Sequence, residues 1–473
     1  MKTLICIPCL LTGGTEIQTL NTVQALVQGG HEVTVACYFE HTPDMVARYR
    51  KAGAEVILFS SEGVRVGGYK SILFLYRHLR RAIRAVRPDV THVQYMAPGA
   101  TVILLLWLMG VKNIIATAHT AADIYKDLRL IHFLQRHCLR AFTCITERAE
   151  RSFFCSSQLY TPDLLLGRRN HFTIYNSLPV KLGWSCNENE DENENCLRNV
   201  ALNLTQTSQN SQKASHLTLA PVGVDLKVRP CCHPDGDSFA VTKTKTKTTS
   251  EVSALNLTQK SQNSQNNENG QQPTTESSQS QSSSSLSSSS QKEPSAPFVL
   301  GVVSRLEPIK GMDLVVPAFA EVLRAYPETQ LLVVGDGTLR ASMEEQAAQL
   351  GCADHIRFVG RQPQEELSQW YTQMDIVLMP SRSEGFGLTA IEAMAHGCVM
   401  VASDVGGLPE VVRDGVCGLL HRTEDIADMA SKICSLIGDE ALYTQLRAQS
   451  LVEVEKYSFE RYAELIHNLY GKL

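Results

Sequence analysis

Residues 383–397 read SEGFGLTAIEAMAHG, and they follow the apolar run DIVLMP at 375–380. The order is an apolar strand, a tight turn and a helix, because the apolar residues after the turn repeat at helical spacing. Gly385 and Gly387 let a ligand approach the backbone without a Cβ atom in the way. In a parallel α/β sheet, phosphorylated ligands bind at such a junction, so this stretch predicts an anion site in an α/β fold.

Two carboxylates bracket this turn. Glu384 stands in the turn itself, and Glu392 stands one turn into the helix. The helix start can hold a phosphate with its backbone N–H groups, while the carboxylates can accept hydrogen bonds from sugar hydroxyls. The pattern is typical of a site for a nucleotide-linked sugar.

Length and charge narrow the class of protein. The chain has 473 residues, which is more than one hydrophobic core usually serves, so we expect two domains. Residues 1–180 carry 20 Lys and Arg against 12 Asp and Glu, whereas residues 297–473 carry 14 against 25. A nucleic-acid-binding protein would gather positive charge around its binding groove, so we expect no nucleic-acid partner. A basic N-terminal half suits contact with an anionic surface or acceptor.

The cysteines and the apolar runs bear on localisation. The 14 cysteines are scattered, mostly singly in apolar segments, which is typical of reduced core thiols. Cys6 and Cys9 have CxxC spacing, but no second ligand pair stands at metal spacing, so we interpret them as core cysteines. The first residues indicate a strand and not a signal peptide, and the longest apolar run, 102–109, is far shorter than the roughly 20 residues of a spanning helix. We expect a cytoplasmic protein without a transmembrane segment.

Short apolar runs alternate with amphipathic ones along both ends of the chain, which predicts parallel strands covered by helices. Strands are expected at 3–10, 32–39, 55–60, 89–95, 113–118, 142–146 and 171–176. After residue 297, strands are expected at 298–303, 330–334, 356–359, 375–379 and 398–402, and helices at 311–325, 338–350, 364–373, 387–396, 424–437 and 458–470. Residues 181–296 are rich in Asn, Gln, Ser, Thr and Glu, and they predict a largely disordered, low-complexity insertion with a short ordered island near 217–230.

Two features of the N-terminal half can line a site. Gly13 and Gly14 form a turn between the first strand and its helix, and this turn either accepts an anion or sugar or is a tight turn only. His119 follows the strand at 113–118, at the sheet edge where open α/β folds place ligands. The alternative for His119 is a loop histidine bonded to the backbone.

The helix expected at 69–87 is both apolar and basic. Its apolar side is predicted to consist of Ile72, Tyr76, Leu79, Ile83 and Val86. An adjacent stripe carries Arg77, Arg80, Arg81, Arg84 and Arg87. One interpretation is a solvated basic face. The other is peripheral contact with an anionic membrane, on its inner face, where each cation contributes about 1 kcal/mol.

Arg305 and Lys310 leave the end of the strand at 298–303 and stand five residues apart. Two such cations can straddle a diphosphate, or they form an ordinary surface pair. A cation about 4 Å from a phosphate oxygen contributes on the order of 4 kcal/mol at an effective dielectric near 20, against at most about 1 kcal/mol for a helix dipole. No acidic cluster suited to magnesium is evident in the sequence, so Arg and Lys alone are expected to stabilise the diphosphate.

Two further strand-end turns contain Gly335 with Gly337 and Gly360 with Arg361. Either turn can frame a base and a ribose, and either can be ordinary turn chemistry.

Together, the motifs reach across both halves of the chain. They are Gly13-Gly14-x-Glu16, His119, Ser304-Arg305-Leu306-x-x-x-Lys310-Gly311, Gly335-Asp336-Gly337, Glu384-Gly-Phe-Gly-x4-Glu392 and Gly406-Gly407-Leu408-Pro409-Glu410. This set resembles the retaining glycosyltransferases of family four, also described as glycosyl transferases group 1, which have the GT-B fold. The resemblance implies two Rossmann-like α/β domains facing across a cleft, with an acceptor domain at 1–180, the insertion at 181–296 and a nucleotide-sugar donor domain at 297–473.

The resemblance also implies an activity. Such an enzyme moves a hexose-type sugar from a UDP- or GDP-sugar to a glycan, lipid or small-molecule acceptor, with retention, without a metal and without a further cofactor. The residues implied to be catalytic are His119, Glu384, Arg305 and Lys310. The residues implied to bind the donor are Gly14, Arg305, Lys310, Gly335, Gly337, Arg361, Glu384, Phe386, Gly387, Leu388 and Glu392.

Individual roles follow from the same resemblance. Arg305 and Lys310 would hold the diphosphate, and Glu392 would hold the ribose hydroxyls. Glu384 would contact the transferred sugar together with the N–H groups of the turn that follows it. Gly14 would approach the donor phosphate, and His119 would line the pocket of the reacting sugar.

The sequence departs from the family pattern at several points, and two rival functions remain. Thr120 follows His119 where the family often has Asp, and the segment 222–225 lacks the Asn that commonly precedes Gly-Val-Asp. The insertion falls at the hinge between the domains. The first rival is a nucleotide-sugar 2-epimerase of the same fold, for which no acid/base set is evident. The second is a nucleotide-sugar-binding protein without turnover.

Overall fold

The computed structural model describes residues 1–61, 63, 68–94, 96–125, 127–164, 167, 170–179 and 297–473. The expected insertion at 181–296, with its island near 217–230, lies outside the described residues. The described residues belong to one compact unit that joins Met1–Gln212 with Ala296–Leu473.

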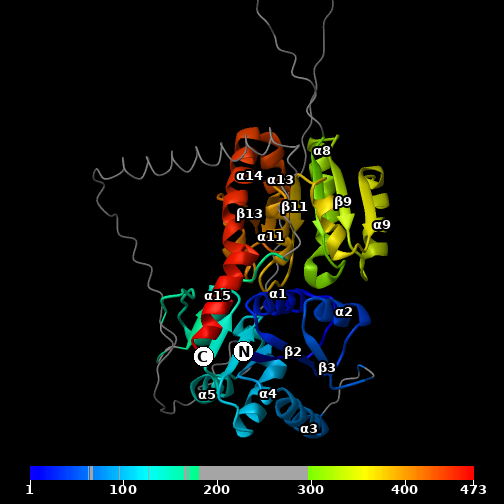
Figure 1. Cartoon of the computed structure of the whole chain (residues 1–473). Helices are drawn as coiled ribbons and strands as arrows, with labels where there is room; N and C mark the ends of the chain where they lie inside the picture. Colours follow the sequence, from blue (N-terminus) through cyan, green and yellow to red (C-terminus); the bar gives the residue numbers. More distant parts are fainter. Residues whose placement is uncertain are drawn as a thin grey trace, which may run out of the picture. The chain divides into compact units, whose positions relative to one another are not determined.

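The N-terminal half forms a seven-stranded parallel sheet (Figure 1). In chain order its strands are β1 (Lys2–Ile7), β2 (Glu32–Cys37), β3 (Glu55–Leu58), β4 (Val90–Gln94), β5 (Ile114–Ala118), β6 (Ala141–Cys144) and β7 (His171–Thr173). In space they follow the order β3-β2-β1-β4-β5-β6-β7. Because the order reverses between β1 and β4, the loops after these two strands diverge, which is where such sheets hold ligands.

Helices cover both faces of this sheet. They are α1 (Gly14–Gln28), α2 (Pro43–Lys51), α3 (Gly68–Val86), α4 (Met96–Leu108), α5 (Arg129–His137) and α6 (Glu147–Phe154). Alternate residues of β1 enter different cores, since Leu4 joins one buried cluster and Ile5 the other. All seven predicted N-terminal strands are confirmed.

The C-terminal half forms a six-stranded parallel sheet in the order β10-β9-β8-β11-β12-β13. Its strands are β8 (Val299–Val303), β9 (Gln330–Val334), β10 (Ile356–Gly360), β11 (Ile376–Met379), β12 (Val399–Ser403) and β13 (Gly418–His421). Its helices are α8 (Val315–Ala325), α9 (Arg340–Gln349), α10 (Leu367–Tyr371), α11 (Leu388–Ala395), α12 (Leu408–Val411), α13 (Ile426–Gly438) and α14 (Glu440–Val454). Two parallel α/β sheets confirm the predicted fold class, while β13, α12 and α14 were not predicted.

The last helix, α15 (Phe459–Gly471), packs on the N-terminal sheet and not on the C-terminal one. Tyr462, Ile466 and Leu469 are buried in the same core as β1 and α1. The Tyr462 hydroxyl lies 2.7 Å from Thr22 Oγ1 on α1. The helix expected at 458–470 therefore contributes buried side chains to the core of the N-terminal sheet, and Figure 1 shows the ribbon of α15 beside α1.

Helix α3 buries a different side from the predicted one. Leu75, Leu79 and Ala82 are buried, whereas Ile72 is 50% and Tyr76 36% exposed. The predicted apolar side is thus wrong at Ile72 and Tyr76, because the buried stripe is centred on Leu75 and Leu79. Within the part of the chain that the structure describes, no helix has the length and apolarity needed to cross a bilayer.

Both cysteines of the CxxC pair are free thiols, and the prediction of a core cysteine is confirmed for Cys6, whereas Cys9 is only partly buried. Cys6 is fully buried in the core, and burial raises the pKa of its thiol to about 12. Cys9 donates a hydrogen bond to Glu16 Oε1 over 3.1 Å. These two side chains serve packing and local hydrogen bonding.

Candidate active site

The predicted strand, turn and helix at 375–397 are confirmed as β11, a glycine turn and α11. Gly387 precedes α11 with φ at 103°, and a Cβ atom there would lie 2.8 Å from Leu408 Cδ2. Only glycine fits this backbone without strain. The first N–H groups of α11, beginning with Leu388, have no intrahelical acceptor and form a site for negative charge.

The Glu384 turn is held by close backbone contacts. A Cβ atom on Gly406, where φ is 57°, would lie 1.8 Å from the carbonyl oxygen of Glu384. The N–H of Gly407 donates to that same oxygen over 3.1 Å. On the other side, a Cβ atom on Gly385 would lie 2.6 Å from the carbonyl oxygen of His119. The turn is therefore fixed between two backbones that leave no room for side chains.

Helix α1 begins beside α11. Gly14 is the first residue of α1, and a Cβ atom there would lie 3.4 Å from Leu388 Cδ1. The starts of two helices therefore lie close together, each with a partial positive charge from its helix dipole. This juxtaposition can hold an anion with more than one charged group, such as a diphosphate.

Glu410 joins the two halves of the chain on the other side of this turn. Its two carboxylate oxygens accept hydrogen bonds from the N–H groups of Glu147, over 2.8 Å, and Arg148, over 2.6 Å. These N–H groups open α6, so the Glu410 carboxylate also lies at the positive end of a helix. The Gly406–Glu410 motif thus helps to fix the N-terminal half against the C-terminal half.

Lys310 and Glu384 form an ion pair, with Nζ and Oε2 2.6 Å apart. Their side chains are 21% and 13% exposed, and Glu384 Oε1 also accepts from the N–H of Gly385 over 3.1 Å. The resemblance implies separate roles for these residues, on phosphate and on sugar. The structure brings them into contact. A bound donor must therefore either interact with both side chains of the ion pair or break the contact between Lys310 and Glu384.

Arg305 lies exposed on the turn between β8 and Lys310. Gly335 and Gly337 hold this turn, since Cβ atoms on them would lie 1.8 Å from the Ser304 carbonyl oxygen and 2.5 Å from the Leu306 carbonyl oxygen. Glycine is therefore required at both positions for backbone packing. Their part in binding a base or ribose stays a prediction.

Arg382 is a residue that the sequence analysis missed. Its guanidinium binds Asp313 through two contacts of 2.7 Å, Glu424 through contacts of 2.5 and 2.9 Å, and the carbonyl oxygen of Pro308. Hydrogen bonding to these carboxylates raises the pKa of Arg382, and the bond from Arg382 lowers the pKa of Asp313. The Arg382 guanidinium therefore links the segment that contains Lys310 to the segment that contains Glu384.

Glu392 is 5% exposed, and among the described residues its hydrogen-bond donors are two uncharged side chains. Oε1 accepts from Gln364 Nε2 over 2.8 Å, and Oε2 accepts from the Tyr371 hydroxyl over 3.0 Å. Burial raises its pKa from 4.5 to about 7, although both hydrogen bonds act in the opposite direction. A carboxyl group that titrates near neutral pH is a candidate for a functional role.

His119 is buried, directly after the end of β5. Nε2 lies 2.8 Å from Gln94 Oε1, and the ring lines a small polar cavity of about 20 Å³ that His92 also lines. Burial, with a contribution from His92, lowers the His119 pKa to about 3, so the ring is neutral at pH 7. One partner of the ring is thus the Gln94 side chain, and a neutral His119 can position groups but cannot supply a proton at neutral pH.

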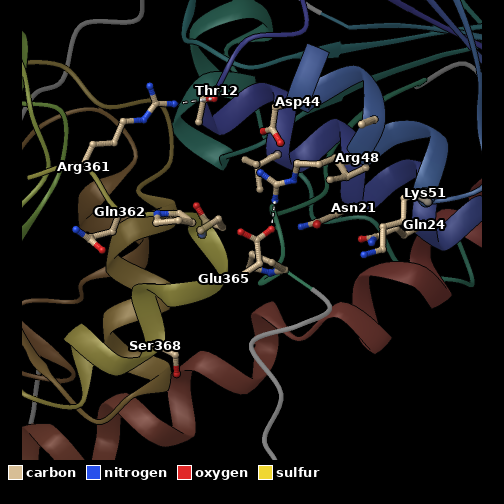
Figure 2. A pocket seen from close by; sticks show the side chains of 17 residues that line it. Thr12, Asn21, Gln24, Asp44, Arg48, Lys51, Arg361, Gln362, Glu365 and Ser368 are labelled. Carbon is tan, nitrogen blue, oxygen red and sulfur yellow. Dashed lines mark hydrogen bonds and ion pairs between the residues drawn. The ribbon is translucent and has the colours of Figure 1, made fainter. Parts of the chain in front are cut away.

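A larger cavity of about 850 Å³ lies beside this site (Figure 2). Helices α1 and α2 line one wall, and residues 361–368 line the other. Two contacts bridge these walls. Arg361 Nη2 donates to Thr12 Oγ1 over 3.3 Å, and Arg48 Nη2 lies 3.6 Å from Glu365 Oε1.

The fold and this site define the class of protein. Two parallel α/β sheets meet at a pair of helix N-termini beside Lys310, Glu384 and Glu392, which is the arrangement of a GT-B glycosyltransferase. Residues 285–451 match the family model "Glycosyl transferases group 1", and residues 12–161 match the model "Glycosyltransferase Family 4". The chain belongs to the family-four glycosyltransferases.

Curated relatives agree with this family. A D-inositol 3-phosphate glycosyltransferase of Nocardia farcinica is 39% identical over 173 residues, which are 35% of this chain and 38% of the relative. Its counterpart in Corynebacterium jeikeium is 36% identical over 193 residues, 39% of this chain and 46% of the relative. The matches therefore span less than half of either relative.

Among solved structures, Anabaena Alr3699/HepE in complex with UDP has a TM-score of 0.64 at 15% identity, with 100% of both chains covered. The lipopolysaccharide outer core galactosyltransferase WaaB has a TM-score of 0.60 at 14% identity, also with 100% of both chains covered. At these identities the likeness concerns the fold.

Proposed function

We propose that this protein transfers a hexose-type sugar from a UDP- or GDP-sugar to a glycan, lipid or small-molecule acceptor, with retention and without a metal. The observation that carries the proposal is the meeting of the α1 and α11 N-termini beside Lys310. Arg305 stands on the same turn as Lys310, so two cations and two helix ends are available to one diphosphate. The solved Anabaena neighbour was crystallised with UDP and with UDP-glucose, which makes UDP the first base to test.

The chemistry proceeds at one carbon of the donor sugar. Its bond to the leaving phosphate oxygen breaks, and the acceptor oxygen bonds to the same face of that carbon. The acceptor proton passes to the leaving phosphate oxygen. Lys310 and Arg305 stabilise the charge that grows on the diphosphate, which is the electrostatic contribution that such a site offers. Glu384, released from Lys310 by the diphosphate, is then free to accept a hydrogen bond from the sugar.

The two rivals are less well supported. A 2-epimerase needs an acid and a base at the sugar; the neutral His119 does not supply the acid at pH 7, and its lowered pKa makes it a weak base. A binding protein without turnover would bind the same nucleotide, so only an assay of turnover separates it from the proposal. The name of the curated relatives makes D-inositol 3-phosphate the first small-molecule acceptor to test.

The direct test is hydrolysis and transfer of UDP-sugars in the presence of a chelator. We expect the protein to release UDP from one of UDP-glucose, UDP-galactose or UDP-N-acetylglucosamine, and we expect the rate to persist in excess EDTA. The physical reason is that Arg305 and Lys310 neutralise the leaving group. Loss of turnover with EDTA, restored by Mg²⁺ or Mn²⁺, would contradict the metal-free part of the proposal. Binding of UDP without turnover of GDP- or UDP-sugars would favour the non-enzymatic rival.

The face around α3 supports the proposed contact with an anionic membrane. Ile72 and Leu73 are each 50% exposed beside the arginines of α3. Trp107 on α4 packs edge-on against Phe133 on α5 at 6.5 Å between ring centroids, and these rings are 40% and 42% exposed. Exposed apolar and basic groups on adjacent helices suit insertion between anionic headgroups.

We expect the protein to sediment with vesicles that contain phosphatidylglycerol, and the double substitution Ile72→Glu with Leu73→Glu to lower this binding at least tenfold. The added charges oppose both burial and the headgroups. Leu350 on the C-terminal half is 45% exposed, so Leu350→Glu is the matched control. An equal loss in both variants, or no vesicle binding by the unaltered protein, would argue against this surface.

A further inference from the structure

Gln364 lies between the large cavity and the Glu392 carboxylate. Gln364 is among the residues that line the cavity, whereas Glu392 and Tyr371 are not. The Gln364 amide reaches from that wall to Glu392 Oε1 over 2.8 Å. The carboxylate itself is 5% exposed. A ligand that enters the cavity therefore meets the Gln364 amide before it meets Glu392.

The two donors on Glu392 differ in their freedom to move. Tyr371 is completely buried in the core of the C-terminal sheet, so its hydroxyl on Oε2 is fixed by packing. Gln364 is only half-buried and borders open space, so its side chain can rotate. A hydroxyl that approaches the carboxylate from the cavity can replace the Gln364 amide without disturbing the core.

The backbone around Gln364 is held on both sides. Three residues earlier, Arg361 donates to Thr12, and one residue later, Glu365 pairs with Arg48 of α2. Figure 2 shows these contacts on the two walls of the cavity. Because the segment is held by a contact on each side of Gln364, Glu392 can be uncovered by rotation of the Gln364 side chain while the backbone stays in place.

We propose that Gln364 occupies the ribose position on Glu392 in the unliganded protein, and that the hydroxyls of an incoming nucleoside diphosphate displace it. This inference rests on the proposed function, because it takes the ligand of Glu392 to be a ribose. It makes Gln364 a specificity-determining residue. Only a ligand with a free 2′,3′-diol replaces the hydrogen bond that the Gln364 amide gives up.

The consequence is a measurable competition. A nucleotide whose ribose hydroxyls bind Glu392 must first break the Gln364 to Glu392 hydrogen bond, so removal of the amide should strengthen the binding of that nucleotide. One hydrogen bond of ordinary net strength corresponds to about a fivefold change in affinity. A ligand without the diol does not use Glu392 and should not gain from the removal.

The experiment is calorimetric titration of the full chain with UDP and with 2′,3′-dideoxy-UDP. For Gln364→Ala we expect UDP to bind about fivefold more tightly and the dideoxy compound to bind unchanged. The serine side chain of Gln364→Ser is too short to reach Glu392, so this variant should bind UDP as Gln364→Ala does. It tests the inference independently if Gln364→Ala fails to fold. Gln349→Ala is the matched control, because it removes the same amide from the exposed end of α9, where Gln349 contacts Glu345 and not Glu392.

Each result decides the matter. Unchanged or weaker UDP binding by both Gln364 variants would show that the amide supports Glu392 or is irrelevant to it, and would overturn the inference alone. An equal gain for UDP and for the dideoxy compound would also overturn it, since the diol would then have no part. If the unaltered protein binds neither UDP nor GDP, the proposed function fails and this inference fails with it.

Discussion

Replacement of Lys310 by Met is expected to slow sugar transfer about 10³-fold, because a cation near a phosphate oxygen contributes on the order of 4 kcal/mol at an effective dielectric near 20. The substitution also leaves the Glu384 carboxylate, which is 13% exposed, without the ammonium that lies 2.6 Å away. The reaction loses the group that stabilises the leaving diphosphate, so kcat should fall more than UDP affinity. Steady-state kinetics with the accepted UDP-sugar, together with UDP titration, measures both quantities.

Two variants make this result specific. Lys310→Arg keeps a cation at the site and should recover part of the lost rate, since only its geometry differs. Lys432→Met makes the same chemical change on α13 and should leave kcat unaltered. A Lys310→Met enzyme that keeps kcat within about threefold of the original would show that Lys310 pairs with Glu384 for structural reasons only.

Replacement of Glu392 by Gln is expected to weaken UDP binding by about 10² and to change how stability depends on pH. The carboxylate accepts hydrogen bonds from ribose hydroxyls, and hydrogen bonds to a charged group contribute about 1.5–3 kcal/mol. The amide keeps the shape of the side chain but not the charge. UDP titration at pH 8 measures this loss, and Glu384→Gln, which is expected to lower kcat more than affinity, is the control.

The pH dependence follows from the raised pKa of Glu392, about 7 in the folded protein against an ordinary 4.5. Between these values the folded state holds a proton that the unfolded state has lost, so this group lowers the free energy of unfolding as pH rises through the window. Glu392→Gln should therefore be more stable than the original protein at pH 8, by up to about 3 kcal/mol, and the two should converge near pH 4. Thermal unfolding at both pH values measures the difference, and parallel curves would contradict the assignment.

UDP binding by the unaltered protein should respond in the opposite sense. Because ribose hydroxyls donate to the ionised carboxylate, affinity should rise between pH 6 and pH 8 as Glu392 loses its proton. The pKa of His119 is lowered to about 3, so this histidine does not titrate in the same range.

The sequence was informative about the fold because buried parallel strands are continuous apolar runs. Every predicted strand from 3–10 to 398–402 is found, with ends displaced by a few residues. Strand β13, GLLH, was missed because its large apolar side chains are only the adjacent pair Leu419 and Leu420, which form no recognisable strand pattern. Helix α15 was predicted, but its packing in the core of the N-terminal sheet was not, since an amphipathic pattern predicts a helix but not the sheet that covers it.

The sequence predicted those parts of the site in which a glycine turn or a charged residue directly follows a strand. Three contacts could not be predicted, because each joins residues far apart in the chain. They are the ion pair of Lys310 with Glu384, the ion pairs of Arg382, and the hydrogen bonds from the start of α6 to Glu410. Gln364 carried no signal at all, being one of several glutamines in a polar segment. The direction of the His119 side chain was equally inaccessible, since it depends on the Gln94 amide on a neighbouring strand.

The most direct test is a crystal structure of the protein with UDP. We predict that the diphosphate lies between the starts of α1 and α11, with Lys310 Nζ about 3 Å from one of its oxygens, and that both ribose hydroxyls reach Glu392. Gln364 should then be turned away from the carboxylate. A diphosphate bound away from Lys310, or a ribose that leaves Glu392 bonded to Gln364, would contradict the account.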